Sequence, residues 1–480
     1  MKKFLSGVLC LAMILSLATG CSASSGTSAA SKAPDAASAT PQSAAEVKKF
    51  SVKLGIWPED TLTDDIKMHE GFVTEFKKTH PDVEIVPSYY KYATDTFVSL
   101  ASSGKLPTVF ETWYTEPQKL IAGDFVADIT DVLKEKNWPD QMNDSIKNLL
   151  SKDGRIYGVP RDGYALGLMI NVDMFRAAGL VDDKGYPIYP KTWDELAVTA
   201  QKIKQKTGEA GFCLLGKDNA AGWHFSNIAW DFGATLTTES NGKFTANVNT
   251  PEAIAAMQYV KDLRWKYDCL TADPTKEDWA SGFVNLGTGA AAMYIGANDA
   301  VNQPTQVNKL PLKDLALVPI PAGPKGQYSL SGGTPYMFAK NATKDEISAA
   351  LDYIEIMGKS PMTSESALSG MVADAKNRVT NGVPVLPVFP AWTDKAYLDA
   401  NAKIVQENSN IDMKLYQDYY TAIGTKGNLH FEEVGDAQDL YAELTKVIQA
   451  VVTDKNTDIS KMMAAANTNY QKILDDKVNK

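Results

Sequence analysis

The amino-acid sequence predicts an α/β fold in which parallel strands are covered by helices on both faces. Segments rich in β-branched and aromatic residues alternate with helical segments, which is the pattern of strands joined by helical crossovers. The chain has 480 residues, 44% of them hydrophobic, which is enough for a large core and favours two domains. Its formal net charge of −10 argues against a nucleic-acid partner, because phosphates need a basic surface.

The N-terminus is typical of a bacterial lipoprotein. Two lysines precede an apolar run over residues 8–18, and Gly20 and Cys21 follow. The run is too short to span a bilayer comfortably, so residues 1–20 are predicted to be a signal peptide. Cys21 resembles the cysteine of a lipobox, so we expect it to be acylated and to anchor the mature chain. Plain secretion is the alternative.

Residues 21–46 are predicted to be a tether between the lipid and the folded part. They are mostly Ser, Ala, Thr, Pro and Lys, a composition that cannot bury a core. About 25 residues of such a coil reach roughly 25–30 Å. No later stretch is long and apolar enough to span a bilayer. The folded part is therefore expected at the extracellular face of the bacterial cytoplasmic membrane, held there by its lipid only.

The folded part begins with three predicted strands that alternate with two helices. The strands cover residues 50–56, 83–90 and 107–114, and the helices cover residues 69–79 and 94–102. In open α/β sheets, ligands bind beyond the carboxyl ends of the strands. Packing in the core or at the rim is the competing interpretation for each aromatic residue there. The residues expected on one wall of a cleft are Trp57, Glu59, Asp60, Glu111, Trp113 and Tyr114.

An Asp-Gly turn and two strands separated by a proline are predicted over residues 153–171. The first strand, over residues 156–159, stops at Pro160, because proline cannot donate to a strand ladder. The apolar run over residues 165–171 is too short for a helix and is predicted to be a buried strand.

Two capped helices follow these strands. Asp173 is the expected cap of a short helix that ends at Gly179, in the usual position of a C-terminal glycine. Thr192 is the expected cap of a longer helix, with Glu195 three residues on as its capping-box partner.

This segment resembles the part of bacterial extracellular solute-binding proteins, the family that includes maltose-binding protein, in which the chain first passes from one lobe to the other. Several motif pieces at the right spacing are more specific than any one of them. Ile170 departs from the tyrosine that the family often has there, and a buried strand accepts either residue. The resemblance rests on Asp153, Gly154, Tyr157, Gly158, Pro160, Asn171, Asp173, Phe175, Ala178, Gly179 and residues 191–196.

The resemblance implies a two-lobed periplasmic-binding-protein-like fold, each lobe a mainly parallel sheet flanked by helices, joined by a multi-segment hinge. It places hinge segments near Pro160 and at residues 319–326. The implied boundaries are residues 47–159 and 329–371 for the first lobe and residues 160–328 and 372–480 for the second lobe with the C-terminal helices.

The elements after the first crossing are expected in the family's order. A β-hairpin follows Gly233, and Thr250 caps an amphipathic helix that begins with a proline. The chain beyond about residue 372 is expected to be mostly helical. Strands are expected at residues 211–216, 287–295 and 331–339, and a helix at residues 344–357.

The remaining candidate ligand contacts lie near the crossing and on the second lobe. Trp223 and Trp230 are seven residues apart and share one helix face, for which core packing is an equally good interpretation. Many sugar binders of the family have a tryptophan in the loop at residues 296–299, where this chain has Asn298 and Asp299. Ring stacking on that wall then falls to Trp279 or Tyr294. The candidates beyond the first wall are Arg161, Asp162, Trp223, Trp230, Trp279, Asn298, Asp299 and Tyr336.

The sequence carries no motif that indicates catalysis, a metal or a cofactor. The histidines at 69, 80, 224 and 430 lack paired spacing, and neither a nucleophile elbow nor a phosphate loop is present. Residues 454–458 lack the glycine of a calcium loop. Cys213 and Cys269 are either buried thiols or a disulfide.

The function implied by the resemblance is that of a solute-binding lipoprotein of an ATP-binding-cassette importer. A cleft rich in Trp, Tyr, Asp and Glu favours a carbohydrate, in particular an oligosaccharide, because aromatic faces and carboxylates suit sugar rings and hydroxyls. The expected partners are this sugar and the permease subunits, with the protein a monomer. The alternatives are a binder of a peptide or polyamine, a receptor for a sensor kinase, and a polysaccharide-degrading enzyme.

Overall fold

The computed structural model describes residues 49–433 and 435–479, all of which belong to one compact unit, Lys48–Lys480. The predicted signal peptide, Cys21 and the tether lie outside the described residues. Within the described ranges, no helix combines the length and the apolar character that crossing a membrane requires.

An eight-stranded sheet runs through the unit with the strand order β10-β6-β11-β3-β1-β2, while β12 pairs with β11 and β9 pairs with β6. Two short hairpins, β4-β5 and β7-β8, stand apart from it. The strands are β1 (Phe50–Leu54), β2 (Val83–Pro87), β3 (Val109–Glu111), β4 (Ser151–Lys152), β5 (Arg155–Ile156), β6 (Gly158–Asn171), β7 (Thr237–Ser240), β8 (Lys243–Ala246), β9 (Met293–Ala297), β10 (Leu315–Val318), β11 (Ser329–Phe338) and β12 (Leu429–Phe431).

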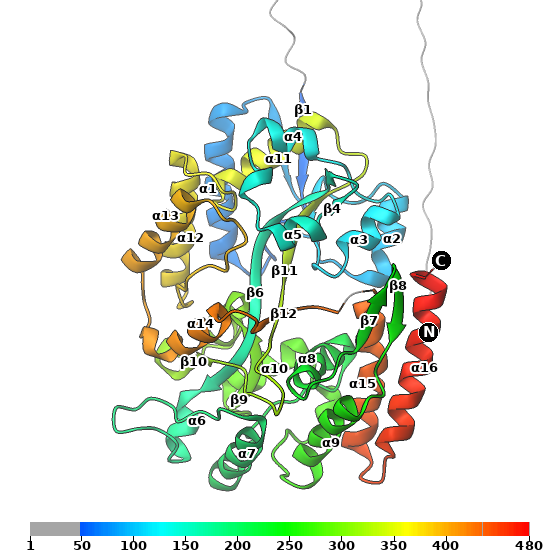
Figure 1. Cartoon of the computed structure of the whole chain (residues 1–480). Coiled ribbons are helices and arrows are strands. Elements are labelled where there is room, and N and C mark those ends of the chain that lie inside the picture. Colours follow the sequence, from blue (N-terminus) through cyan, green and yellow to red (C-terminus); the bar gives the residue numbers. More distant parts are fainter. Residues whose placement is uncertain (1–48, 434, 480) are drawn as a thin grey trace, which may run out of the picture. The chain divides into compact units, whose positions relative to one another are not determined.

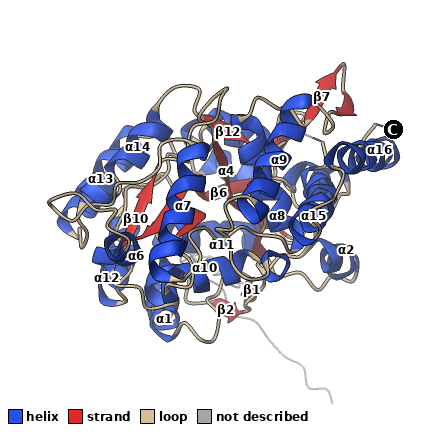
Figure 2. Ribbon diagram, turned by 90° about the horizontal axis from the view of Figure 1, so that it is seen from below, coloured by secondary structure: helices blue, strands red, loops and turns tan. Residues whose placement is uncertain are grey.

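Helices surround these strands when the unit is seen from below (Figure 2). Most begin at a residue whose side chain caps the first turn, as Thr343 does for α11. The helices are α1 (Thr63–Thr79), α2 (Thr94–Ser102), α3 (Pro117–Ala122), α4 (Thr130–Glu135), α5 (Asp144–Leu149), α6 (Val172–Ala177), α7 (Trp193–Thr207), α8 (Asp218–Asp231), α9 (Pro251–Trp265), α10 (Trp279–Thr288), α11 (Lys344–Ile356), α12 (Glu365–Thr380), α13 (Lys395–Glu407), α14 (Gln417–Gly424), α15 (Ala437–Thr453) and α16 (Ile459–Lys477).

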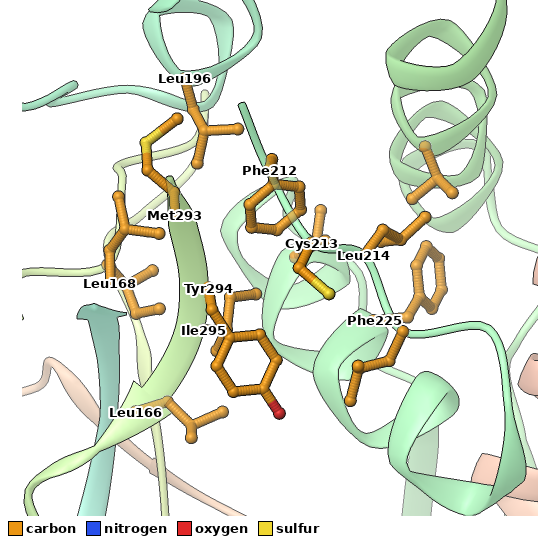
Figure 3. Close-up of a cluster of buried hydrophobic side chains, with 14 of the residues drawn as sticks. Leu166, Leu168, Leu196, Phe212, Cys213, Leu214, Phe225, Met293, Tyr294 and Ile295 are labelled. Atoms are coloured by element: carbon orange, nitrogen blue, oxygen red, sulfur yellow. The ribbon is translucent and has the colours of Figure 1, made fainter. Parts of the chain in front are cut away.

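Separate hydrophobic cores divide the unit into two lobes. The first lobe holds a core around β1 to β3 with a smaller cluster beside it, and the second lobe holds a core around β9 and β10. Figure 3 shows part of the second core, where Met293 and Ile295 of β9 face Leu168 and Phe212. β6 and β11 run from one group of elements to the other (Figure 1), so the chain passes between the lobes along a shared pair of strands.

The helices after residue 371 divide between the two lobes. Trp392, just before α13, and Ile404 of α13 lie in the first core together with Met371 of α12. α15 and α16 contribute to the second core. Most core residues between 371 and 404 thus pack in the first core, although Val383 and Leu386 pack in the second; the lobe boundary near residue 371 stays a prediction.

The two crossing strands pair antiparallel from Ser331↔Ala165 to Met337↔Gly158. Their register shifts between Thr334 and Pro335, where Pro335 lies opposite Pro160. Neither proline has an N–H to give to the ladder, so an irregularity there is expected. The predicted interruption at Pro160 is therefore a bulge inside one continuous strand, β6, and not a break between two strands.

The sheet is more mixed than a mainly parallel one. β1 pairs in parallel with β2 and β3, as expected for the first lobe, but β6 is antiparallel to both β9 and β10 in the second. Residues 211–216 form isolated bridges at Phe212 and Cys213 instead of a strand. The expected strand at residues 287–295 begins only at Met293, because α10 continues to Thr288.

The structure shows which residues cap α6 and α7 and that the two described cysteines are not bonded to each other. Asn171, not Asp173, caps α6, because its side chain accepts from the Met174 backbone N–H. Thr192 caps α7 as predicted, but the Glu195 carboxylate accepts from the Lys191 N–H, one residue earlier than a capping box requires. Cys213 and Cys269 are buried free thiols.

Replacement of Gly222 by alanine is expected to lower the unfolding temperature. A Cβ at Gly222 of α8 would lie 2.1 Å from the Tyr441 carbonyl oxygen of α15, and such overpacking costs about 1–3 kcal/mol. Gly71→Ala is the matched control, because a Cβ at this helical glycine meets nothing within 4 Å and alanine is the better helix former by ~0.5–1 kcal/mol. Calorimetry of both variants checks this, and equal shifts would contradict it.

Candidate ligand-binding site

A pocket of about 930 Å³, open solvent included, lies beside the crossing strand β6. Its walls come from β6, from the turn after β9 in the second lobe, and from α12, α13 and the segment between them. We call it the crossing pocket. Its lining residues are Arg161, Asp162, Gly163, Asn298, Asp299, Met357, Gly358, Lys359, Met371, Asp374, Ala375, Arg378, Val385, Leu386, Pro387, Val388, Phe389, Ala391, Trp392, Tyr397, Asn401, Ile404 and Val405.

The guanidinium of Arg161 joins three strands at this pocket. Its Nη1 donates to Glu111 Oε2 on β3 at 2.7 Å, and its Nε donates to Asp162 Oδ2 on β6 at 2.8 Å. A longer contact of 3.4 Å joins Nη2 to the Thr334 hydroxyl on β11. Burial disfavours the positive charge of Arg161 and would lower its pKa. Attraction by the carboxylates of Asp162 and Glu111 is stronger, so the pKa of Arg161 is raised. Arg161 is therefore occupied by the protein's own acids.

Asp162 and Asp299 place a pair of acids in the same wall. Oδ1 of Asp162 is buried without a hydrogen-bond partner among the described residues. Burial, and then repulsion by the Asp162 carboxylate, raise the pKa of Asp299, although Arg161 opposes the shift. The half-buried Asp299 carboxylate can accept a hydrogen bond from a molecule in the pocket, whereas Asp162 Oδ1 has no accessible surface in this arrangement.

The opposite wall, on α12, carries a compensated ion pair. Arg378 Nε donates to Asp374 Oδ2 at 3.1 Å. Burial would raise the pKa of Asp374, but attraction by Arg378 and Lys359 lowers it to about 2. The lining holds three cationic side chains, Arg161, Lys359 and Arg378, and three acidic ones, Asp162, Asp299 and Asp374. No group of His, Cys, Asp and Glu within the described ranges is arranged to hold a metal ion.

A second set of aromatic and acidic residues lies where α8 and α15 meet the crossing strands. The rings of Tyr164 and Trp223 meet edge to face with centroids 6.0 Å apart. The Tyr441 hydroxyl donates to Glu432 Oε1 at 3.1 Å. Burial raises the pKa of Glu432 to about 8, and the hydrogen bonds from Tyr441 and Trp223 only partly offset it.

Direct contacts near this second set connect the two lobes. Lys119 Nζ of α3 lies 2.7 Å from Oδ1 of Asp436, a buried residue that caps α15. Gln438 Nε2 donates to the Thr115 hydroxyl at 3.3 Å. The first and second lobes are thus bridged beside α3 and α15.

A family model described as "Bacterial extracellular solute-binding protein" matches residues 60–360. The chain belongs to this family. The family resemblance and the two-lobed fold predicted from the sequence are confirmed.

Of two relatives of this solute-binding protein, one has a name that states a ligand and the other does not. A Brucella abortus (strain 2308) protein that is named as a binding protein is 25% identical over 377 residues, which are 74% of this chain and 86% of that protein. The sn-glycerol-3-phosphate-binding periplasmic protein UgpB of Yersinia pseudotuberculosis is 22% identical over 314 residues, which are 62% of this chain and 68% of UgpB.

Two solved structures share the fold of the solute-binding protein. The GacH receptor of Streptomyces glaucescens, solved unliganded and with acarbose, superposes with a TM-score of 0.66 at 19% identity, covering 89% of this chain and 99% of GacH. UgpB of Mycobacterium tuberculosis, in complex with glycerophosphocholine, gives a TM-score of 0.66 at 14% identity, covering 90% and 99%.

The structure brings four of the predicted site residues together in the crossing pocket and a fifth, Glu111, against Arg161. Among the four, Asn298 is committed to the fold, because its Oδ1 accepts from the Tyr419 hydroxyl at 2.9 Å and from the Ala165 N–H. The pocket residues that were predicted are Arg161, Asp162, Asn298 and Asp299.

The predicted aromatic contacts lie elsewhere. Trp230 is buried, and its Nε1 donates to Glu433 at 2.7 Å. Tyr336 is buried in β11 opposite Glu111. Trp113 and Trp279 are exposed at the surface. The predicted residues that do not line the crossing pocket are Trp57, Glu59, Asp60, Glu111, Trp113, Tyr114, Trp223, Trp230, Trp279, Tyr294 and Tyr336.

Sequence reasoning missed the whole wall formed by residues 357–405. The sequence predicts only mostly helical structure beyond about residue 372 and indicates no ligand contact in this segment. One signal was present in the sequence: Asp374 and Arg378 are four residues apart, the spacing of an ion pair on one helix face. The Phe389 ring between two prolines was a weaker signal, because it predicts a loop without saying where the loop lies.

Glu432→Gln is expected to flatten the dependence of stability on pH. The folded protein holds a proton on Glu432 up to about pH 8, whereas an unfolded glutamate loses it near pH ~4.3. The folded state therefore binds more protons in this window, and wild-type stability falls as the pH rises through it. Thermal unfolding at pH 5 and pH 8 should show a smaller difference for Glu432→Gln than for the exposed control Glu239→Gln; equal differences would rule this out.

Proposed function

We propose that this solute-binding protein captures a carbohydrate, in particular an oligosaccharide, in the crossing pocket and delivers it to the permease of an ATP-binding-cassette importer. The observation that carries the proposal is that one pocket takes its walls from both lobes, beside the strands that join them. A ligand there contacts both lobes at once, so it binds the closed arrangement best and shifts the population toward it.

The polar groups of the pocket favour a neutral, hydroxyl-rich ligand. Arg161 and Arg378 already bond to Asp162 and Asp374, so neither cation is left to balance an anionic ligand. The carboxylate of Asp299 suits ligand hydroxyls, which can both donate and accept. The structural neighbour GacH, which was solved with acarbose, adds support.

A ligand with a glycerophosphate group is a second candidate. Lys359 lines the pocket, and its ammonium has no ion pair within the described ranges. Two UgpB proteins among the similar chains carry glycerol phosphate or glycerophosphocholine in their names. Lys359→Gln separates the candidates: in calorimetry it should weaken binding of a phosphate ligand about ten- to a hundredfold and leave binding of a neutral sugar nearly unchanged.

The proposal places the protein at the extracellular face of the cytoplasmic membrane, as a monomer held by acylated Cys21. The expected partners are permease subunits, with no cofactor and no catalysis. Cys21→Ser should release the chain from the cell into the medium, as immunoblots of the cell and medium fractions would show. Retention of Cys21→Ser on the cell would exclude a lipid anchor at this position.

Asp299→Asn is expected to weaken sugar binding by about ten- to a hundredfold. Hydrogen bonds to charged groups contribute about 1.5–3 kcal/mol, and each 1.4 kcal/mol is about a factor of ten in affinity. The wild-type chain is first screened by thermal unfolding against oligosaccharides, peptides, polyamines and glycerophosphodiesters; a ligand at about 100 times its Kd adds ~2.7 kcal/mol.

Calorimetry then compares Asp299→Asn with Asp183→Asn, an exposed aspartate in a loop of the second lobe. Equal affinities for both variants would move the binding site away from the crossing pocket. An unfolding temperature raised by peptides or polyamines alone would overturn the carbohydrate proposal. Recovery of a cleaved sugar would overturn the proposal of binding without catalysis.

A further inference from the structure

The crossing pocket has an aromatic wall from a segment that we call the strap, residues 383–392. The aromatic residues of the pocket lining are Phe389, Trp392 and Tyr397. Trp392 and Tyr397 are buried, with exposed fractions of 1% and 7%, so their rings are committed to the first core. Phe389 is only half-buried. Of the aromatic rings in this lining, Phe389 is the one that still offers surface to a ligand.

The crossing strand is shaped to receive this ring. A Cβ placed on Gly163 of β6 would lie 2.3 Å from Cδ1 of Phe389 and 2.7 Å from Cε1. The ring therefore rests directly on the backbone of β6, in space that any other residue at 163 would occupy. Gly163 follows Arg161 and Asp162, so the ring lies beside the polar groups of the pocket.

The strap holds Phe389 between anchors on both lobes. On the first-lobe side, the Asn143 N–H donates to the Ala391 carbonyl at 3.0 Å, and the Trp392 ring meets Trp138 edge to face. On the second-lobe side, the Tyr420 hydroxyl of α14 donates to the Pro387 carbonyl at 3.0 Å. A ligand that touches Phe389 therefore touches an element attached to both lobes.

The backbone around Phe389 is restricted by its neighbours. Pro387 and Pro390 flank it at two residues before and one residue after, and proline fixes φ and limits the residue that precedes it. Less conformational entropy is then lost when a ligand settles on the ring. These restraints make Phe389 a preformed surface.

We propose that Phe389 is the platform on which a sugar ring of the ligand stacks, and that it sets the specificity of the pocket for cyclic sugars. This rests on the proposed function. The face of a sugar ring presents polarised C–H bonds, which an aromatic π face attracts. Acyclic polyols and glycerol phosphates have no such face and gain nothing from the ring. The carboxylates and Phe389 together then select a ring with hydroxyls at its edge.

The competing role for Phe389 is to support the strap by apolar packing. Leucine separates the two roles, because it retains apolar volume but has no π face. Stacking predicts that Phe389→Leu raises the Kd for a cyclic sugar about three- to tenfold, in keeping with the extra affinity of aromatic contacts. It also predicts that Phe389→Trp binds within about twofold of wild type. Packing alone predicts that leucine is tolerated and that the larger tryptophan is not.

The experiment uses the full chain in detergent and isothermal calorimetry with the oligosaccharide that most raises the wild-type unfolding temperature. The control is Phe232→Leu, a half-buried phenylalanine whose ring contacts Tyr259 in the second lobe, which should bind as wild type. Unliganded unfolding temperatures establish that each variant is folded.

Loss of affinity in Phe389→Leu with affinity kept in Phe389→Trp supports the platform. Wild-type affinity in Phe389→Leu overturns it and leaves the proposed function standing. If the wild-type chain binds no saccharide, the proposed function fails and the platform fails with it.

Discussion

The ion pairs of Arg161 are the interaction on which the crossing depends. Three strands meet there, and two of them bring a carboxylate, Glu111 and Asp162, toward the same partly buried space. Without a cation between them, two such carboxylates could not both stay charged in a low-dielectric site. The guanidinium is planar and has several donors, so it can satisfy both and still reach Thr334. The acids can therefore stand where the chain crosses between the lobes, at the place proposed for the ligand.

This constraint also explains the polarity of the pocket. Because Arg161 and Arg378 are paired within the protein, the charged groups of the lining left to a ligand are the Asp299 carboxylate and the Lys359 ammonium. The Asp374–Arg378 pair on the facing helix is likewise closed on itself. A ligand that binds Arg161 or Arg378 would have to break one of these pairs and leave a buried charge behind, which is costly. A neutral ligand with hydroxyls needs no such exchange.

The fold was largely predictable from the sequence because its signals are local. The turn at Asp153, the cap at Thr192 and the strand-ending residues near Glu111 depend on neighbours within a few positions. The pocket was predictable only in part. Arg161 and Asp162 follow the proline that marks the crossing, but Trp230 and Tyr336 were predicted to meet a ligand and are buried within the fold. A tryptophan has the same local pattern whether it packs inward or faces a cleft, and only tertiary packing decides between them.

The wall formed by α12, the strap and α13 shows the limit more clearly. Nothing local indicates that Phe389 rests on Gly163, more than 200 residues earlier in the chain, because the contact exists only once the helices pack on the first lobe. The same wall bears on closure. The strap meets both lobes on one side of the crossing strands, while Lys119–Asp436 and Thr115–Gln438 join the lobes near α3 and α15. With both arginines of the pocket already paired, the free energy that would favour the proposed closure has to come mainly from hydrogen bonds and ring contacts made with both lobes at once.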